Sequence, residues 1–442
     1  MNDLPKLIRE AAEPLVGSKS DYDSLLDLVG DARFVLLGEA THGTHEFYRA
    51  RAQITKRLIL EKGFCAVAIE GDWPDAYRVN QFVRGVGEDI QATAALAGFQ
   101  RFPQWMWRNA DVLDFVGWLR EHNDGKSEDD KTGFYGLDLY SLRSSIEAVV
   151  NYLAKVDPAS ARRARRRYAC FDHFGADTQN YGLATGLGIS RTCEEDVIHE
   201  LVELRLREFD YLQRDGRIAA DEFFWAEQNA LVVKNAERYY RTMFHGEVSS
   251  WNLRDRHMMD TLISLASHLE QFTSPAKIVV WAHNSHVGNA LATQMRDRGE
   301  FNLGQLARDR FVHHAVLIGF TTYEGTVTAA SGWDEPSRRK LVTPAVPESY
   351  EMVFHLTEQP RFWLEFLKHP EVTFNLRAKR LERAIGVIYR PETELASHYF
   401  TARLPDQFDA VLHFDTTRAV EPLERSSRWS RHEVHETFPT GV

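Results

Sequence analysis

One segment, residues 32–71, constrains the fold of this 442-residue chain more than any other. Residues 33–37 (RFVLL) and 65–69 (CAVAI) form two apolar, β-rich runs. Between them, residues 44–62 carry a helical pattern, and Gly63 stands where a glycine commonly ends a helix. Strand, helix and strand with short links predict a βαβ unit whose two strands are parallel and lie in a central sheet.

Further β-rich runs follow at intervals along the chain. They lie at 134–137, 277–282 and 410–414, with 314–320 and 325–330 interpreted as an antiparallel pair and 384–389 as a late strand. These runs predict an α/β fold with a mixed, mainly parallel central sheet flanked by helices. Residues 158–273 instead carry long helical patterns and little β signal. We therefore expect an α/β core in two parts, 1–157 and 274–442, with an inserted helical lobe at 158–273.

Composition limits the partners and the location that we expect. The chain has 53 basic and 64 acidic residues, a net charge of −11, which argues against nucleic acid or an anionic membrane as a partner. We find no run of about 18 apolar residues, and charges stand where a signal peptide needs an apolar run, so we expect a cytoplasmic protein. The three cysteines, Cys65, Cys170 and Cys193, are widely spaced, and we expect reduced thiols.

Ionisable residues follow four of the predicted strands. They are Glu39 and His42, then Glu70, then Asp138, and finally His283 and His286. In open α/β sheets, ligands bind beyond the carboxyl ends of the strands, where such residues converge. The pattern therefore predicts an active site, and the alternative is a set of ordinary caps and turn residues.

The turn after the first strand carries the most informative residues. A carboxylate at Glu39 can orient the imidazole of His42 and raise its basicity, unless Glu39 or Thr41 merely caps the helix. Arg51 falls on the buried stripe of the helix at 44–62, so its guanidinium must be paired, with Glu39 or Glu70 as the available acids. Such a pair is either purely structural or a functional anchor.

The loop at 283–286 offers two imidazoles three residues apart. His283 and His286 can each donate a hydrogen bond to a developing oxyanion, although either alone is commonly a core histidine. Two common catalytic motifs are absent from the sequence. It contains neither the GxSxG turn of α/β-hydrolases nor a phosphate-binding P-loop.

Five segments together resemble the erythromycin esterase family. They are LLGEATHGTHEFY, AIEGDWPDAYRVNQFVRG, GLDLYS, WNLRDRHM and VVWAHNSHVG. The resemblance implies a sheet core and a helical lobe around a deep cleft. It also implies opening of a macrolide lactone by water, without a serine nucleophile. By the same resemblance, His42 is the base and the other catalytic residues are Glu39, Arg51, Glu70, His283 and His286.

The leading hypothesis is hydrolysis of a small-molecule ester or lactone. We expect the reaction to need no metal or other cofactor, and the protein to be a monomer or a weak homodimer. The residues expected to contact the substrate are Phe102, Trp105, Trp107, Asp138, Tyr140 and Arg254, although the aromatic residues at 99–107 can equally belong to ordinary packing. One alternative is a divalent-metal hydrolase that uses the same Glu and His residues. Another is a non-catalytic small-molecule binding protein.

Overall fold

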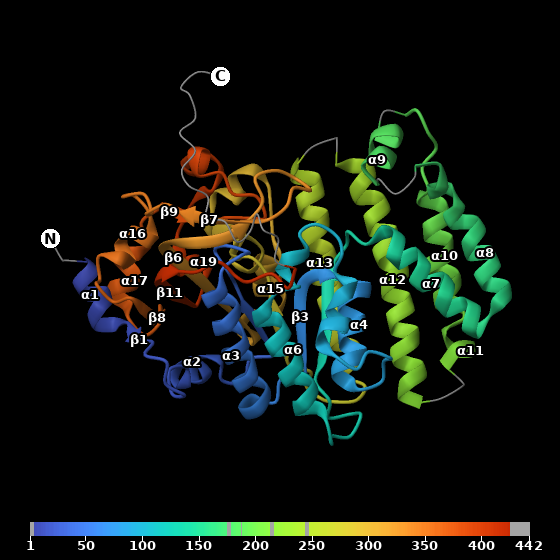
Figure 1. Ribbon diagram of the computed structural model, residues 1–442, viewed down its shortest axis with the longest axis horizontal. Coiled ribbons are helices and arrows are strands. Elements are labelled where there is room, and N and C mark those ends of the chain that lie inside the picture. The colour runs from blue at the N-terminus through green and yellow to red at the C-terminus, as the bar shows by residue number, and fades with distance from the viewer. Residues whose placement is uncertain (1–3, 175–177, 187, 213–215, 244–246, 425–442) are drawn as a thin grey trace.

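A computed structural model describes residues 4–174, 178–186, 188–212, 216–243 and 247–424. In this part of the chain a nine-stranded sheet runs through the centre of the molecule, helices cover both of its faces, and a group of long helices stands to one side (Figure 1). This α/β architecture with a helical lobe agrees with the fold class predicted from the sequence.

The central sheet is mixed and mostly parallel. Its strands are β1 (Glu13–Pro14), β2 (Phe34–Leu37), β3 (Ala66–Asp72), β4 (Gly133–Asp138), β5 (Ile278–Trp281), β6 (Ala315–Ala329), β7 (Arg338–Val342), β8 (Arg361–Glu365) and β11 (Ala410–Thr417). The order is β1-β8-β11-β6-β2-β5-β3-β4, with β7 paired to β6. The strands from β11 to β4 in this order pair in parallel, whereas β8, β1 and β7 join antiparallel. Strands β9 (Arg380–Arg383) and β10 (Tyr399–Ala402) form a separate small sheet.

The helices are α1 (Leu4–Ala11), α2 (Asp23–Val29), α3 (His45–Lys62), α4 (Trp73–Arg84), α5 (Ala92–Ala95), α6 (Ala110–Asn123), α7 (Leu142–Val156), α8 (Pro158–Tyr168), α9 (Thr178–Gly186), α10 (Glu194–Leu206), α11 (Glu208–Leu212), α12 (Gly216–Thr242), α13 (Glu247–Leu269), α14 (Asn284–Val287), α15 (Leu303–Phe311), α16 (Tyr350–His355), α17 (Pro370–Leu376), α18 (Glu394–Ser397) and α19 (Leu404–Gln407).

Alternating side chains of the buried strands enter two hydrophobic cores. On β2, Val35 and Leu37 face a core closed by α2, α3, α4 and α6, while Phe34 and Leu36 face one closed by α1, α13, α15, α16 and α17.

The predicted βαβ unit is present as β2, α3 and β3. Helix α3 ends at Gly63, which adopts the left-handed conformation (φ 72°) and donates its backbone N–H to the carbonyl of Leu58. Because β5 lies between β2 and β3, the helix crosses over a neighbouring strand before the chain re-enters the sheet.

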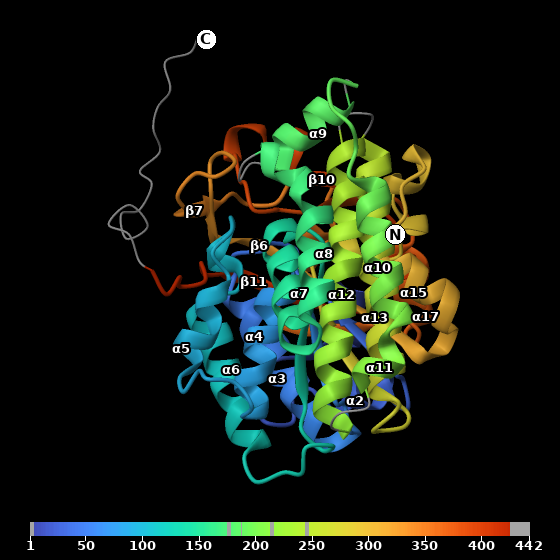
Figure 2. The same cartoon turned by 90° about the vertical axis from the view of Figure 1, so that its right-hand side faces the viewer.

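The lobe beside the sheet has an apolar core of its own. Helices α7, α8, α10 and α12 lie alongside one another in Figure 2, and their inward side chains form a hydrophobic cluster separate from the two sheet cores. Helix α13 lies next to α12 and packs against the sheet, so it connects the lobe to the core. The division at 158 and 273 stays a prediction, and we observe only that α7, which precedes residue 158, packs with the lobe helices.

One predicted strand pairing and one predicted strand are wrong. Residues 314–320 and 325–330 are not an antiparallel pair, because both belong to the single strand β6, whose antiparallel partner is β7. Residues 384–389 make only isolated bridges, Ile385 with Thr41 and Ile388 with Ala330, because this segment crosses over the ends of the sheet instead of running along it.

The prediction of three reduced cysteines is also wrong. Cys170 and Cys193 form a disulfide, with Cα atoms 5.9 Å apart, and Cys65 is the free cysteine. The two residues are separated by 23 positions in sequence but meet because the end of α8 and the start of α10 pack together in the lobe core. Among the described residues, no helix has both the length and the apolar character needed to cross a membrane.

Candidate active site

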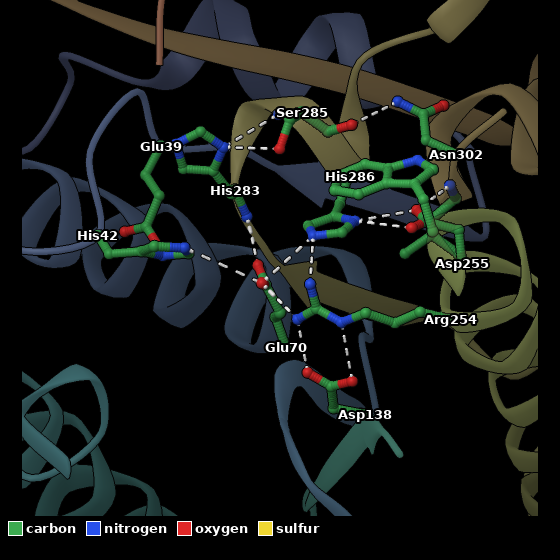
Figure 3. Close-up of polar contacts among 12 residues, drawn as sticks. Glu39, His42, Glu70, Asp138, Arg254, Asp255, His283, Ser285, His286 and Asn302 are labelled. Carbon is green, nitrogen blue, oxygen red and sulfur yellow. Dashed lines mark hydrogen bonds and ion pairs between the residues drawn. The ribbon is translucent and has the colours of Figure 1, made fainter. Parts of the chain in front are cut away.

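The carboxyl ends of β2, β5, β3 and β4 lie side by side, because these parallel strands are neighbours in that order. The residues that follow them therefore meet at one edge of the sheet (Figure 3). The structure brings together all six ionisable residues expected there, namely Glu39, His42, Glu70, Asp138, His283 and His286.

The two carboxylate oxygens of Glu39 hold two different partners. Oε1 lies 2.9 Å from His42 Nδ1, and Oε2 lies 2.6 Å from Arg51 Nη2. Arg51 is fully buried on α3, where the rings of Tyr48 and Trp281 lie against its guanidinium. Of the two acids considered for Arg51, Glu39 is the one that pairs with it. Because Nδ1 of His42 faces Glu39, the Nε2 atom points the other way, toward Oε1 of Glu70 at 4.0 Å, and both residues line the cavity.

Close packing fixes the turn that carries His42. A Cβ atom on Gly43 would lie 1.9 Å from the carbonyl oxygen of Thr328 on β6, so only glycine fits at this position. The backbone N–H of His42 donates to the carbonyl of Ile385, 3.3 Å away. The imidazole is thus carried by a turn that contacts two other parts of the chain.

Glu70 lies at the centre of the site and has partners on several sides (Figure 3). Its Oε2 accepts the backbone N–H of His283 at 2.8 Å, and its Oε1 accepts from Arg254 Nη2 at 2.8 Å. The same Oε1 lies 3.4 Å from His286 Nε2 and 4.0 Å from His42 Nε2. Burial by itself would raise the pKa of this carboxyl, but its interactions with His286, His42 and Arg254 outweigh burial and hold the pKa well below its usual range.

The two histidines of the 283–286 loop differ in charge state. His283 accepts the backbone N–H of Ser285 at Nδ1 (3.2 Å) and donates from Nε2 to the carbonyl of Ala40 (3.2 Å). Burial, together with the neighbouring His42, lowers the pKa of His283 to about 3. This ring is therefore neutral, and both of its nitrogens already have partners in the protein.

His286 is held by a carboxylate and an aromatic ring. Its Nδ1 lies 2.9 and 3.0 Å from the two oxygens of Asp255, and the indole of Trp251 stacks on the imidazole with centroids 4.6 Å apart. Burial opposes the charged form, but Asp255 and Glu70 outweigh it and raise the pKa of His286 to about 9. This ring is therefore a cation at neutral pH.

Sequence reasoning assigned Asp255 at most a bracing role beside Arg254, and it assigned no role to Trp251. Asp255 directly follows Arg254 in the WNLRDRHM segment, and this adjacency was its only signal. Nothing in the spacing connects residue 255 with residue 286, because the contact depends on how α13 packs against the sheet.

Arg254 and Asp138 form a two-point ion pair on the wall of the site. Nε and Nη2 of the arginine lie 3.0 and 2.6 Å from the two oxygens of the aspartate. Burial would raise the pKa of Asp138, but the guanidinium outweighs burial and lowers it. The ring of Tyr140 lies under the same guanidinium, 4.9 Å from its centre. All three residues line the cavity, where substrate-contacting residues were expected.

A cavity of about 400 Å³ opens above this cluster. Of the three aromatic residues expected to contact substrate, Phe102 and Trp107 line it, whereas Trp105 does not.

The wall of the cavity also contains three ionisable residues that the sequence analysis missed, namely Asp72, Asp75 and Arg101. Asp72 pairs with Arg101 at 2.8 Å, but Asp75 makes no hydrogen bond or ion pair with any described residue. Burial and the nearby Asp72 raise the pKa of Asp75 to about 8.

The donor set of the site fits a metal ion poorly. Within the described ranges, we find no group of three or more His, Cys, Asp and Glu side chains arranged to hold one. The guanidinium of Arg254 contacts Glu70, Asp138 and His286, so a fixed positive charge stands among the ligands that a cation would need.

Comparison with known proteins agrees with this fold. Residues 59–417 match the family described as erythromycin esterase. YbfO of Bacillus subtilis (strain 168) is 21% identical over 427 residues, which cover 92% of this chain and 89% of that protein. Erythromycin esterase type II of Escherichia coli is 22% identical over 321 residues, covering 70% of this chain and 73% of that protein.

Two solved structures share the fold. A Bacillus cereus protein has a TM-score of 0.79 and 21% identity, covering 96% of this chain and 99% of its own. A mutant of the erythromycin esterase EreC, in its open conformation, has a TM-score of 0.65 and 17% identity, covering 92% and 96%. The family match, and not the fold alone, indicates a hydrolase. The chain belongs to the erythromycin esterase family, and the matched stretch contains Glu70, Arg254, His283 and His286, while Glu39, His42 and Arg51 precede it.

Proposed function

We propose that the protein hydrolyses a carboxylic ester or lactone of a small molecule, with a water molecule activated by His42 as the nucleophile. One observation carries the proposal. Nδ1 of His42 is held by Glu39, and Glu39 is held in turn by the buried Arg51, so Nε2 faces the cavity as a proton acceptor. A carboxylate-backed imidazole of this kind is the usual general base of hydrolases.

The other charged groups of the site suit the later part of such a reaction. When water attacks the acyl carbon, negative charge develops on the carbonyl oxygen and must be met by preorganised donors. Arg254 and His286 are both cationic and both line the cavity. We assign the oxyanion contact to Arg254, whose guanidinium charge does not depend on a ring proton, because His283 is neutral and has partners in the protein at both ring nitrogens.

The cavity bears on the class of substrate. Its volume of about 400 Å³ lies within the range of small-molecule sites, and its wall combines aromatic rings with the charged groups. A relative carries the name erythromycin esterase type II, so macrolide lactones belong in the first panel of substrates. Incubation of the protein with macrolides and simple esters, followed by mass spectrometry, tests the proposal through the addition of one water molecule to the lactones and cleavage of the esters.

Replacement of the base gives the first prediction. His42→Ala should lower kcat about 10²- to 10⁴-fold, the usual contribution of a positioned base, while circular dichroism and melting temperature stay close to those of the native protein. His45→Ala is the matched control, because His45 lies three residues away, pairs with Asp111 and does not line the cavity. Full activity of His42→Ala on a confirmed substrate would refute the assignment of the base.

Removal of metal gives the second prediction and separates the alternatives. We expect activity to survive exhaustive chelation, because Arg254 stands where a cation would have to bind. Activity that is lost with chelator and restored by zinc or manganese would instead support the metal-dependent hydrolase. Tight binding of a panel compound without turnover would support the binding protein.

A further inference from the structure

We infer that His286 is the general acid that protonates the departing alcohol, and that Asp255 and Trp251 are positioning residues that keep its ring charged and oriented. The inference rests on the proposed function. It also narrows the substrate class to esters or lactones of unactivated aliphatic alcohols, because only such leaving groups need a proton at the moment the C–O bond breaks.

Asp255 is built as a fixed support for this imidazole. Its side chain is fully buried, and both oxygens face Nδ1 of His286. One of these oxygens also accepts the backbone N–H of Leu303 at 2.8 Å, which anchors the carboxylate to α15. A buried carboxylate on one ring nitrogen stabilises the imidazolium and directs the proton on the other nitrogen into the site.

Trp251 restrains the plane of the same ring. The indole and the imidazole are nearly parallel, with an angle of 7° between their planes, and an aromatic face attracts a cation stacked on it. The indole is fixed in turn, because its Nε1 donates to the carbonyl of Phe301 at 2.9 Å. Unlike Asp255, Trp251 lines the cavity, so it can also restrict where the leaving group lies.

The charged groups that face His286 suit both of its protonation states. As a cation, the ring directs Nε2–H toward Glu70 Oε1, 3.4 Å away on β3. Nε2 also lies 3.0 Å from Arg254 Nη1 on α13, an N–H group that can donate to Nε2 only when the ring is neutral. His42 lies on the other side of Glu70 Oε1, and burial, Asp255, Glu70 and Arg254 together raise the pKa of His286 to about 9.

The proton balance of the reaction closes within this cluster. His42 takes a proton from water as the new C–O bond forms, and the tetrahedral intermediate then expels the alcohol oxygen with the electron pair of the breaking bond. That oxygen takes the Nε2 proton of His286. The step leaves His42 protonated and His286 neutral, and transfer of one proton across Glu70 Oε1, which lies between the two rings, restores both.

The test compares two esters of one acid that the protein accepts, an ethyl ester and a 4-nitrophenyl ester. In Asp255→Asn, we expect kcat on the ethyl ester to fall about 10- to 100-fold, while kcat on the nitrophenyl ester changes less than about threefold, because nitrophenolate leaves without a proton. The ratio of the two rates does not depend on how much of the variant is folded. Trp251→Leu should change the ratio in the same direction by a smaller factor.

A second readout needs no substrate. NMR titration of histidine-labelled protein, with the His286 signal assigned from His286→Gln, should show a pKa near 9 that falls in Asp255→Asn. The alkaline limb of kcat on the ethyl ester should move to lower pH with it. Asp415→Asn is the matched control, because Asp415 also contacts a histidine (His355 Nδ1, 2.8 Å) but lies outside the cavity, so neither readout should move.

Equal losses on the two esters, together with an unmoved alkaline limb, would overturn the acid role of His286. An unchanged titration of His286 in Asp255→Asn would overturn the positioning role. If the native protein cleaves neither ester nor any macrolide while the titration shifts as expected, the positioning role stands and it is the proposed function that fails.

Discussion

Two buried carboxylates of this site, Glu39 and Glu70, each bind more than one partner. Glu39 joins His42 to Arg51, and Glu70 joins Arg254 to the backbone of His283. A buried charge is costly unless it is paired, so the loss of one member leaves its partner uncompensated. Substitutions at these positions should therefore affect stability and activity together.

Arg51 gives the third prediction. Arg51→Met leaves Glu39 buried without its cation, so we expect the free energy of unfolding to fall by about 3–5 kcal/mol in urea titrations. Activity should fall as well, because Arg51 no longer holds the Glu39 carboxylate in place against Nδ1 of His42. The double variant Arg51→Met, Glu39→Gln should regain part of the lost stability.

An exposed ion pair provides the comparison for Arg51. Arg9 pairs with Glu358 at 2.9 Å, with the two side chains 44% and 79% exposed, so Arg9→Met should change the free energy of unfolding by less than about 1 kcal/mol. A loss in Arg51→Met no larger than the loss in Arg9→Met would contradict the view that Arg51 compensates a buried charge.

Asp75 gives the fourth prediction, on pH dependence. Because the pKa of Asp75 is raised to about 8, the carboxyl is mostly neutral at pH 7 and becomes an anion as the pH rises through 8. The KM of an ester that carries a quaternary ammonium should therefore fall between pH 7 and pH 9, relative to the KM of its neutral isostere. Asp75→Asn should abolish this difference, and a difference that persists in the variant would assign it to another group.

At the scale of elements, the local sequence pattern was sufficient to predict a segment in which several signals agree. The run, helix and run at 32–71 were predicted nearly to the residue, because strand and helix patterns and Gly63 all agree there. The long strand β6 was misinterpreted because TTYEG at 321–325 resembles a turn. In the structure, Thr321 and Thr322 are buried, and their hydroxyls bond to His413 and Thr417 on β11.

Gly325 gives the fifth prediction. It adopts a φ of 138°, and a Cβ atom there would lie 2.1 Å from the carbonyl oxygen of Thr417, so this glycine permits the close approach of β11 to a continuous strand. Gly325→Ala should lower the free energy of unfolding by about 1–3 kcal/mol or more. Gly117→Ala, inside α6 with no atom within 4 Å of the added Cβ, should be neutral or slightly stabilising, and equal losses would contradict the steric explanation.

At the scale of the whole molecule, strand order determines which residues meet. The sequence identified the polar strand ends, and the general rule for open sheets placed them at one edge, but neither predicts that β5 lies between β2 and β3. That order sets the 283–286 loop between His42 and Glu70. Asp255 and Trp251 come from α13, where the lobe meets the sheet, so they required the tertiary packing that local patterns do not encode.

The lobe gives the last prediction, because its apolar core is separate from the two cores of the sheet. The disulfide between Cys170 and Cys193 closes a segment of the lobe, and cross-links over such lengths contribute about 3 kcal/mol. Thiol titration of the unfolded protein should find one thiol before reduction and three after it, since the chain has three cysteines. In the reduced protein, amide exchange should accelerate in α8 and α10 but not in β2, β3 and β5. Equal acceleration in the strands would mean that lobe and sheet unfold as one unit. The stability of the whole active site would then depend on the disulfide.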